Sequence, residues 1–181
     1  MTIMEDKEII EGCIRKEQKF QKALYDKYSA LLFGICRKNS RNIQDAEDMF
    51  QEAFIKLYSS LEKYSFQGSF EGWLRKFFLY FSWNWYRGKN AVKDEREITD
   101  ISDAFGLTTH NNVFDTFTDE ELLRALQMLQ DKERIIFTMT EIEGIDIEEV
   151  SKQTGLQVVT IQSMNSRTKK KLKNYFINMQ N

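Results

Sequence analysis

The chain has 181 residues, of which 41% are hydrophobic and 30% are charged, a balance typical of a folded globular protein and not of a disordered one. Its 26 Lys and Arg residues and 28 Asp and Glu residues give a net charge of −2, which excludes a general electrostatic affinity for nucleic acid and leaves only local patches for such binding. The absence of proline and the presence of only eight glycines favour a mainly helical chain.

The cysteine and histidine residues of the chain give little indication of an enzyme or a metal site. Cys13 and Cys36 lie within helical patterns without metal-ligand spacing, so we expect buried thiols in a reducing compartment. His110 is the only histidine, which argues against a histidine-based metal site or catalytic triad. The acidic N-terminus lacks a signal-peptide pattern, and no apolar run approaches membrane-spanning length. We therefore expect a cytoplasmic protein with no catalytic residue, metal or cofactor and no membrane contact.

The first part of the chain predicts four helices. A short amphipathic segment over residues 4–11 is followed by a longer one over 17–37, in which apolar residues recur every three or four positions. The same spacing predicts a helix over residues 45–61, and the polar sequence KYSFQGS that follows predicts a loop. A further helix begins after Ser69, which can cap it, and runs to about Arg87.

The second part of the chain predicts a helix-turn-helix. Thr118 and Glu121 have the spacing of a capping box at a helix start. The turn QTGLQ joins the last two predicted helices, of which the second is polar and basic. The four helices are expected over residues 119–129, 131–142, 146–153 and 157–177. The predicted fold is all-α, with two small helical domains over residues 1–90 and 119–181 and a flexible acidic linker over residues 91–118 between them.

The sequence GSFEGWLRKFFLYFSWNWYRGKN, residues 68–90, combines aromatic and basic side chains. An advance of about 100° per residue places one set on a single face as a core stripe: Phe70, Trp73, Leu74, Phe77, Phe78, Phe81 and Trp85. A second stripe alternates cations and rings: Lys76, Tyr80, Trp83 and Arg87. If exposed, this stripe suits single-stranded nucleic acid, because bases stack on rings and phosphates pair with cations. Alternatively, Tyr80 and Trp83 pack under another helix or the linker, and the pattern leaves both interpretations open.

Three motifs of the chain match a known pattern. They are DAEDMFQEAFIKLY (residues 45–58), GSFEGWLRK (68–76) followed by WYRGKN, and ALQMLQDKERIIFTMTEIEGIDIEEVSKQTG (125–155). Together they resemble a bacterial RNA polymerase sigma factor of the sigma-70 family, in the extracytoplasmic-function (ECF) group. The resemblance covers nearly the whole chain. It implies region 2 and region 4 domains in a transcription initiation factor that binds core polymerase, directs it to promoters and melts the minus-ten element, with no enzymatic step of its own.

The resemblance also implies three sets of binding residues. One docks on the clamp helices of the polymerase beta-prime subunit: Asp45, Asp48, Gln51, Glu52 and Lys56. Another captures unpaired non-template bases of the minus-ten element: Lys63, Tyr64, Ser65, Phe66, Gln67, Ser69, Lys76, Tyr80, Trp83 and Arg87. The third meets the double-stranded minus-thirty-five element: Thr160, Gln162, Ser163, Arg167, Lys169 and Lys170. The beta flap of polymerase is a further implied partner, as is either an anti-sigma factor or a DNA-bound or RNA-guided recruiting complex.

The chain departs from the family pattern at several positions. Tyr80 stands where Asn is common, and Asn84 where Asp is common. In region 4, Gln162 and Met164 replace longer polar or cationic side chains, and Asn165 replaces an apolar core residue. Because direct readout needs donors and acceptors aimed at base edges, we hypothesise that region 4 reads its upstream element weakly and that a recruiting partner guides promoter choice.

Two other functions stay open at this stage. A sigma-like interaction protein would bind polymerase or an anti-sigma factor without directing initiation. A plain helix-turn-helix repressor would leave the DAED motif and the aromatic stripe without a role.

Overall fold

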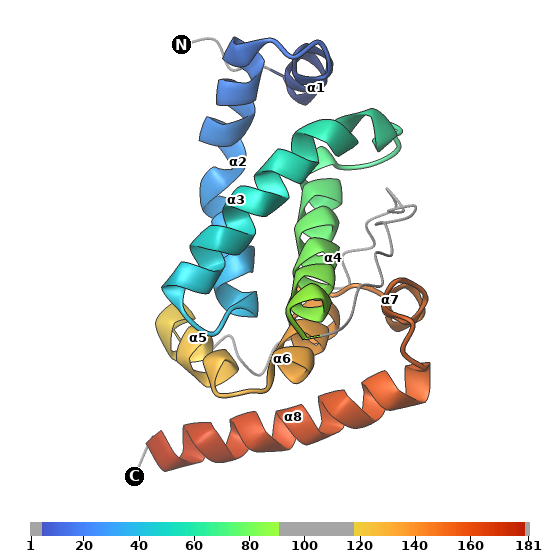
Figure 1. The fold of residues 1–181 in the computed structure, drawn as a ribbon. Coiled ribbons are helices and arrows are strands. Elements are labelled where there is room, and N and C mark those ends of the chain that lie inside the picture. Colours follow the sequence, from blue (N-terminus) through green and yellow to red (C-terminus); the bar gives the residue numbers. More distant parts are fainter. Residues whose placement is uncertain (1–4, 91–117, 180–181) are drawn as a thin grey trace.

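Two long helices, α2 (Gln18–Asn39) and α4 (Phe70–Asn90), form the frame of the N-terminal half (Figure 1). This computed structural model describes residues 5–90 and 118–179. Helix α3 (Ile43–Ser60) packs on both frame helices, and α1 (Asp6–Ile14) packs near the start of α2. Asp6 fastens α1 to α2, because its carboxylate accepts hydrogen bonds from Lys27 Nζ at 2.7 Å and Tyr28 OH at 2.6 Å.

The bounds of these helices follow from capping and from the spacing of apolar residues. Asn42 caps α3 by accepting a hydrogen bond from the Asp45 backbone N–H at 2.8 Å. The buried residues of α3 recur at three- and four-residue spacing, as predicted: Ala46, Met49, Phe50, Ala53, Phe54 and Leu57. The helix ends in a 3-10 turn, η1 (Leu61–Lys63), and an exposed loop leads to α4. The four helices predicted for this half are therefore present, with bounds that differ by at most three residues.

Helix α4 is buried on nearly all its sides, which is the pattern of a central helix. Phe70, Trp73, Leu74, Phe77 and Phe78 are buried as predicted, and the remaining two members of the core stripe, Phe81 and Trp85, are half-buried against the core. Residues outside the predicted stripe, including Leu79 and Ser82, are also fully buried. A single apolar stripe does not explain this burial, so a second layer must cover the other side of α4.

The C-terminal half supplies that layer. It contains α5 (Asp119–Gln127), α6 (Asp131–Phe137), α7 (Ile147–Thr154) and α8 (Val158–Met179). The predicted capping box of Thr118 and Glu121 is present at the start of α5. Gly155, with φ of 73°, ends α7 in the left-handed conformation that glycine adopts readily, and the chain turns there into α8. The pair α7 and α8 is the predicted helix-turn-helix.

The helix predicted over residues 131–142 is not α-helical throughout. From Thr138 to Ile142 it becomes a π-helical turn, η2, a rare form that is frequent at functional sites. This turn brings Glu143 and the backbone that follows it close to the N-terminal half, as described below.

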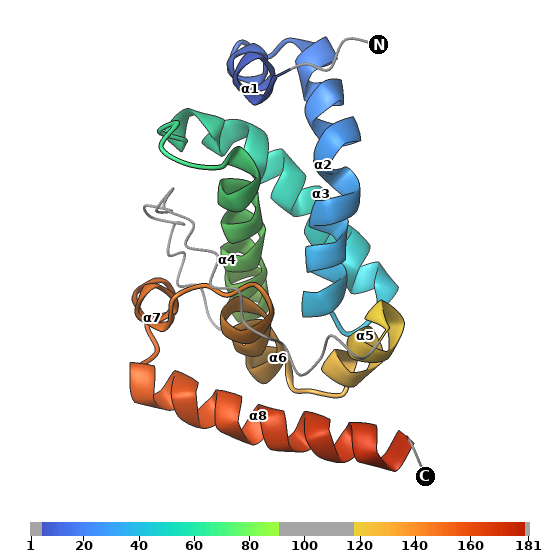
Figure 2. The ribbon, with the colours of Figure 1, turned by 180° about the vertical axis from the view of Figure 1, so that it is seen from behind.

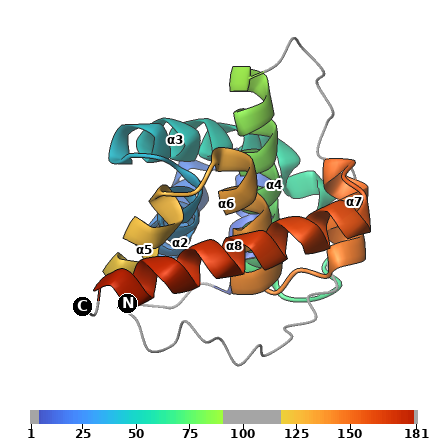
Figure 3. The same cartoon turned by 90° about the horizontal axis from the view of Figure 1, so that it is seen from below.

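The two halves share one continuous hydrophobic core. Ile135 and Met139 of the α6–η2 segment and Val150 of α7 belong to the same buried cluster as Leu32 of α2 and Phe77 of α4. A smaller cluster lies between α5 and α8, and α8 crosses the lower end of the molecule (Figure 3). No strand occurs within residues 5–90 and 118–179, in agreement with the predicted all-α class. Apart from Thr118, the predicted linker lies outside these residues.

The contact between Gly12 and Phe20 provides a test of the packing of α1. A methyl group on Gly12 would meet the ring of Phe20 at 2.0 Å, and this ring is buried. Gly12→Ala is therefore expected to lower the free energy of unfolding by about 1–3 kcal/mol, measured in urea, because a packed core does not absorb extra volume. Gly34→Ala, with no atom near the added methyl group, is the control and should stabilise the helix by about 0.5–1 kcal/mol. Equal effects of the two substitutions would contradict this account.

Candidate nucleic-acid interface

The second stripe of α4, for which the sequence left exposure and burial open, is mostly buried. Lys76, Tyr80 and Trp83 are 2%, 2% and 4% exposed, and Arg87 is half-buried. The interpretation of the stripe as a solvent-facing surface therefore does not hold for the first three side chains in this structure. The reason is tertiary, because α7 packs beside α4 (Figures 1 and 2). The alternative that Tyr80 packs under another helix is confirmed.

Glu149 of α7 makes the contact that covers Lys76 and Tyr80. Its carboxylate lies 2.9 Å from Lys76 Nζ and accepts a hydrogen bond of 2.9 Å from Tyr80 OH. Burial, followed by the nearby charge and the hydrogen bond of Glu149, raises the pKa of Tyr80. Tyr80 thus remains a protonated donor to this carboxylate. The position of Glu149 is set locally, because Asp146 caps α7 by accepting hydrogen bonds from the backbone N–H groups of Glu148 and Glu149.

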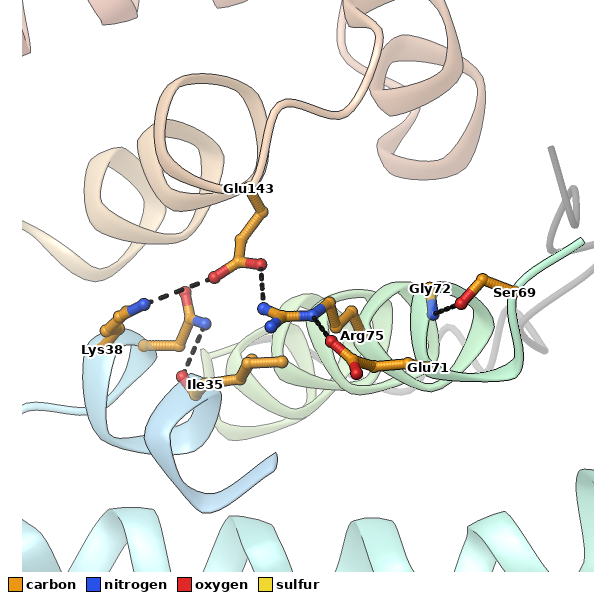
Figure 4. A network of polar contacts seen from close by, with 8 residues as sticks. Ile35, Lys38, Ser69, Glu71, Gly72, Arg75 and Glu143 are labelled. Carbon is orange, nitrogen blue, oxygen red and sulfur yellow. Dashed lines mark hydrogen bonds and ion pairs between the residues drawn. The ribbon is translucent and has the colours of Figure 1, made fainter. Parts of the chain in front are cut away.

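Glu143, six residues earlier in the chain, makes a similar contact with the N-terminal half. Figure 4 shows its side chain pointing between Lys38 of α2 and Arg75 of α4. The two carboxylate oxygens lie 3.4 Å from Lys38 Nζ and 3.0 Å from Arg75 Nη1. Arg75 is held in place from its own helix by Glu71, 3.0 Å from its Nε. The Glu143 side chain is only 5% exposed, so its charge is compensated by these cations and not by water.

A further ion pair joins the halves near α6. Asp131 lies 2.7 Å from Arg41, which follows α2, and it also pairs with the buried guanidinium of Arg134 in its own helix. In each of these ion pairs between the halves, the N-terminal half contributes the cation and the C-terminal half the carboxylate. Sequence reasoning missed Glu143 and Glu149. The acidic sequence EIEGIDIEE was visible, but helical spacing cannot identify a partner 70 residues away.

The loop before α4 is exposed except at Tyr64, whose predicted contact with DNA is not supported by its burial. Tyr64 is buried and donates a hydrogen bond of 2.7 Å to the Gly68 carbonyl, which closes the loop on itself. Phe66 is 48% exposed and adopts φ of 60°, a left-handed conformation that is uncommon for a bulky residue. Such strain clusters at binding sites. The remaining predicted residues of the loop are exposed: Lys63, Ser65, Gln67 and Ser69.

The predicted docking face of α3 borders an apolar groove. Asp48, Gln51, Glu52 and Lys56 are exposed, and Asp45 is half-buried. The groove, with a volume of about 720 Å³, lies between α2 and α3 and is lined mainly by aromatic side chains together with Ile55. Its lining includes Tyr25, Phe33, Phe50, Phe54 and Tyr58. Ile55 is 74% exposed. The sequence analysis did not identify Ile55 as a binding residue. The available signal was that this large apolar residue lies outside the buried stripe of α3.

The outer face of α8 carries the residues predicted for double-stranded DNA. Gln162, Ser163, Arg167 and Lys170 are exposed, and Thr160 is half-buried. Lys169 is exposed but pairs with Glu141 at 2.8 Å. At the start of the helix, Val159 is 64% exposed and offers no hydrogen-bonding group to a base. The cationic residues therefore begin about two turns after the helix start.

The inner face of α8 has a polar core. Asn165 is buried and donates a hydrogen bond of 2.8 Å from Nδ2 to Thr140 Oγ1, which in turn donates to the Ile136 carbonyl at 2.9 Å. Among the described residues, the Oδ1 atom of Asn165 and the hydroxyls of Thr138 and Thr168 are buried without a hydrogen-bond partner. Thr140 thus satisfies the amide N–H of the unusual Asn165 but not its carbonyl oxygen, and this polar pair lies on the inner side of α8.

Within the part of the chain that the structure describes, no three His, Cys, Asp or Glu residues form a group that could hold a metal ion. In that same part, none of the helices has the combination of length and hydropathy that a membrane span requires.

The fold and these surfaces define an all-helical protein with a helix-turn-helix end. The family model for Sigma-70 region 2 matches residues 24–77, and the model for Sigma-70 region 4 matches residues 119–172, together more than half of the chain. The chain therefore belongs to the sigma-70 family of bacterial RNA polymerase sigma factors, in the ECF group. These are transcription initiation factors that bind RNA polymerase and act at promoters, without an enzymatic reaction of their own.

Curated relatives agree with this assignment. The ECF RNA polymerase sigma factor SigE of Mycolicibacterium smegmatis is 27% identical over 146 residues, which cover 80% of this chain but only 56% of that relative. The ECF RNA polymerase sigma-E factor of Haemophilus influenzae is 24% identical over 179 residues, which cover 93% of this chain and 94% of that relative.

Two solved structures have a similar fold. CnrH in complex with the cytosolic domain of CnrY has a TM-score of 0.53 at 16% identity and covers 96% of this chain and 97% of its own. The sigma factor RpoE of Bartonella quintana, in complex with the anti-sigma factor NepR, has a TM-score of 0.55 at 18% identity and covers 84% of this chain and 94% of its own. At these identities the similarity supports the fold alone.

The polar cluster behind α8 predicts a coupled pair of substitutions. Thr140→Val removes the acceptor of the Asn165 amide and should lower the free energy of unfolding by about 1–3 kcal/mol, the cost of a buried unpaired donor. Adding Asn165→Leu to this variant should recover much of the loss, because no unpaired amide then remains. A double-mutant cycle in urea measures the coupling, and strictly additive effects would rule out the proposed pairing.

Proposed function

We propose that this sigma factor docks on core polymerase through α3 and the groove beside it, and melts the minus-ten element with the loop that precedes α4. The observation that carries the proposal is the Phe66 loop, an exposed aromatic residue in a strained backbone conformation, flanked by exposed polar residues and a lysine. Unpaired bases stack on such a ring, and the neighbouring donors suit phosphate and base edges.

The docking part of the proposal rests on the chemistry of the α3 face. The groove is lined by aromatic side chains, the well-exposed Ile55 and the polar residues Glu47 and Gln51, and further carboxylates and Lys56 are exposed on the same helix. A large apolar residue within a charged rim is the arrangement of a protein–protein interface. Asp45, Asp48, Gln51, Glu52 and Lys56 remain the residues proposed to contact the beta-prime clamp helices.

Ile55→Glu tests this interface. Run-off transcription with core polymerase should show initiation at defined sites for the wild-type chain and at least a tenfold loss for Ile55→Glu, a loss of about 1.4 kcal/mol or more of binding free energy. Because Ile55 is exposed, the substitution should leave stability within about 0.5 kcal/mol.

Ile43→Glu, at an isoleucine that is 47% exposed on the same helix but outside the groove, is the matched control. It should initiate normally. Equal losses from both variants would argue against the groove as the docking site.

The absence of initiation by the wild-type chain on every template and with every partner would support the alternative function, a sigma-like protein that binds polymerase or an anti-sigma factor only. That alternative draws on the RpoE neighbour, which was solved with an anti-sigma factor.

For the upstream element, we propose that region 4 contributes more to phosphate contact than to base readout. The exposed start of α8 presents Val159, Gln162 and Ser163, whereas its cations, Arg167 and Lys170, lie further along. Phosphate contacts position a protein on DNA without specifying sequence. A chain with weak upstream readout needs another source of promoter choice, and we propose a DNA-bound or RNA-guided partner that recruits it.

A selection from random promoter sequences with purified polymerase tests weak upstream readout. The selected promoters should share a minus-ten motif and little preference at the minus-thirty-five position, because few groups on α8 can distinguish base pairs. The measurement is the information content of each position in the selected pool. A sharp upstream motif in the absence of any other protein would refute this part of the proposal.

A further inference from the structure

A cavity of about 320 Å³ lies between the end of α2, the start of α3, the last turns of α4 and the start of α6. The first three elements belong to the N-terminal half and α6 belongs to the C-terminal half, where it packs on α2 and α4 (Figure 3). The cavity is distinct from the contacts described above, because neither Glu143 nor Glu149 lines it and no residue of its lining belongs to the second stripe of α4.

The charged groups on the wall of this cavity balance one another. Arg41 and Arg134 supply two guanidinium groups, and Asp45 and Asp131 supply two carboxylates. Asp131 pairs with both arginines, so this group retains one excess positive charge, and Asp45 of α3 supplies the compensating negative charge. Separate regions of opposite charge suit a ligand that carries one charge of each sign. A phosphate or a nucleotide would bring more negative charge than the wall can neutralise.

Two buried side chains of the wall have hydrogen-bonding atoms without a partner. Arg134 and Asn39 are 1% and 2% exposed, and the Nε donor of the first and the Oδ1 acceptor of the second are unpaired. Their other groups are bonded, because Arg134 Nη1 donates to the Leu129 carbonyl at 3.0 Å and Asn39 Nδ2 donates to the Ile35 carbonyl at 2.9 Å. Buried polar atoms are normally paired in native proteins. The unpaired donor and acceptor therefore indicate a ligand that can both accept and donate.

Apolar side chains complete the wall. Met49 of α3 and Ile135 of α6 are buried, and the rings of Trp85 and Tyr86 are half-buried. A few polar groups placed beside aliphatic and aromatic surface is the usual composition of a small-molecule site, and the volume lies at the lower end of the range for such sites. The cavity thus suits a small molecule with an apolar or aromatic group at one end and charges at the other.

We infer that this cavity is a site for a free α-amino acid with an apolar or aromatic side chain. The carboxylate of the amino acid accepts hydrogen bonds from Arg134 and Arg41. Its ammonium group donates to Asn39 and Asp45, and its side chain lies against the apolar part of the wall. Burial lowers the pKa of Arg134 although Asp131 opposes this shift, so a second carboxylate beside the guanidinium is favourable. A ligand held there contacts both halves of the chain.

Thermal unfolding of the full-length chain tests the site with free leucine, methionine and phenylalanine as probes. With each at about 10 mM, a probe that binds only the folded chain with a dissociation constant of about 1 mM should raise the Tm by about 3–5 °C. The N-acetyl and methyl ester derivatives of phenylalanine, which lack the ammonium group's charge and the carboxylate respectively, should leave the Tm unchanged, as should sodium phosphate and adenosine. No shift with any of the three amino acids, or an equal shift with a blocked derivative, phosphate or adenosine, would overturn the inference.

Two variants locate the binding within the cavity. Asn39→Leu removes the unpaired acceptor, and Arg41→Gln removes an exposed guanidinium; each should weaken binding of the responsive amino acid at least tenfold in isothermal titration calorimetry. Arg15→Gln is the matched control, because Arg15 is also exposed and also pairs with a carboxylate, Glu17 at 2.6 Å, but lies outside the cavity. It should bind like the wild type.

Because Asn39 is buried, far-UV circular dichroism of each variant checks that the helices remain folded, and Arg41→Gln decides the outcome if Asn39→Leu does not fold. Equal binding by Arg41→Gln and Arg15→Gln would show that the amino acid does not occupy this cavity. Both assays use the free chain without polymerase or DNA, so they decide this site independently of the result of run-off transcription.

Discussion

The fold depends on the meeting of carboxylates from the C-terminal half with cations on α2 and α4. Glu143 and Glu149 are fixed by the π-turn and by the Asp146 cap, and both are largely removed from water by their partners. A charge placed there without a partner would carry a large desolvation cost. The arrangement of the two halves is therefore specified electrostatically, and the shared hydrophobic core then fills the space between them.

This arrangement gives α4 two distinct faces. One face packs Phe70, Phe77 and Phe78 against α2 and α3 and remains buried in any state in which the N-terminal half is folded. The other face carries Lys76 and Tyr80, which are covered by α7 through their contacts with Glu149.

Three other surfaces of the molecule are exposed to solvent. The groove beside α3, the Phe66 loop at the start of α4 and the outer face of α8 lie on different elements. The polar cluster of Thr140 and Asn165 lies behind the last of these, where an apolar core would have held α8 more firmly. Two of the positions at which the chain departs from the family pattern make contacts of this kind: Tyr80 with Glu149 of α7, and Asn165 with Thr140.

Local sequence determined the helices, the capping box, the turn at Gly155, the core face of α4 and the family, because each depends on residues close in the chain or on contiguous motifs. Helix period alone also identified the second stripe of α4. It could not decide whether that stripe meets water or protein, because the partner of Lys76 and Tyr80, Glu149, lies about 70 residues later. The π-turn that presents Glu143 and the exposed Ile55 beside the groove were likewise decided by tertiary packing. Side-chain spacing reports which residues share a face, and only the folded chain determines what that face touches.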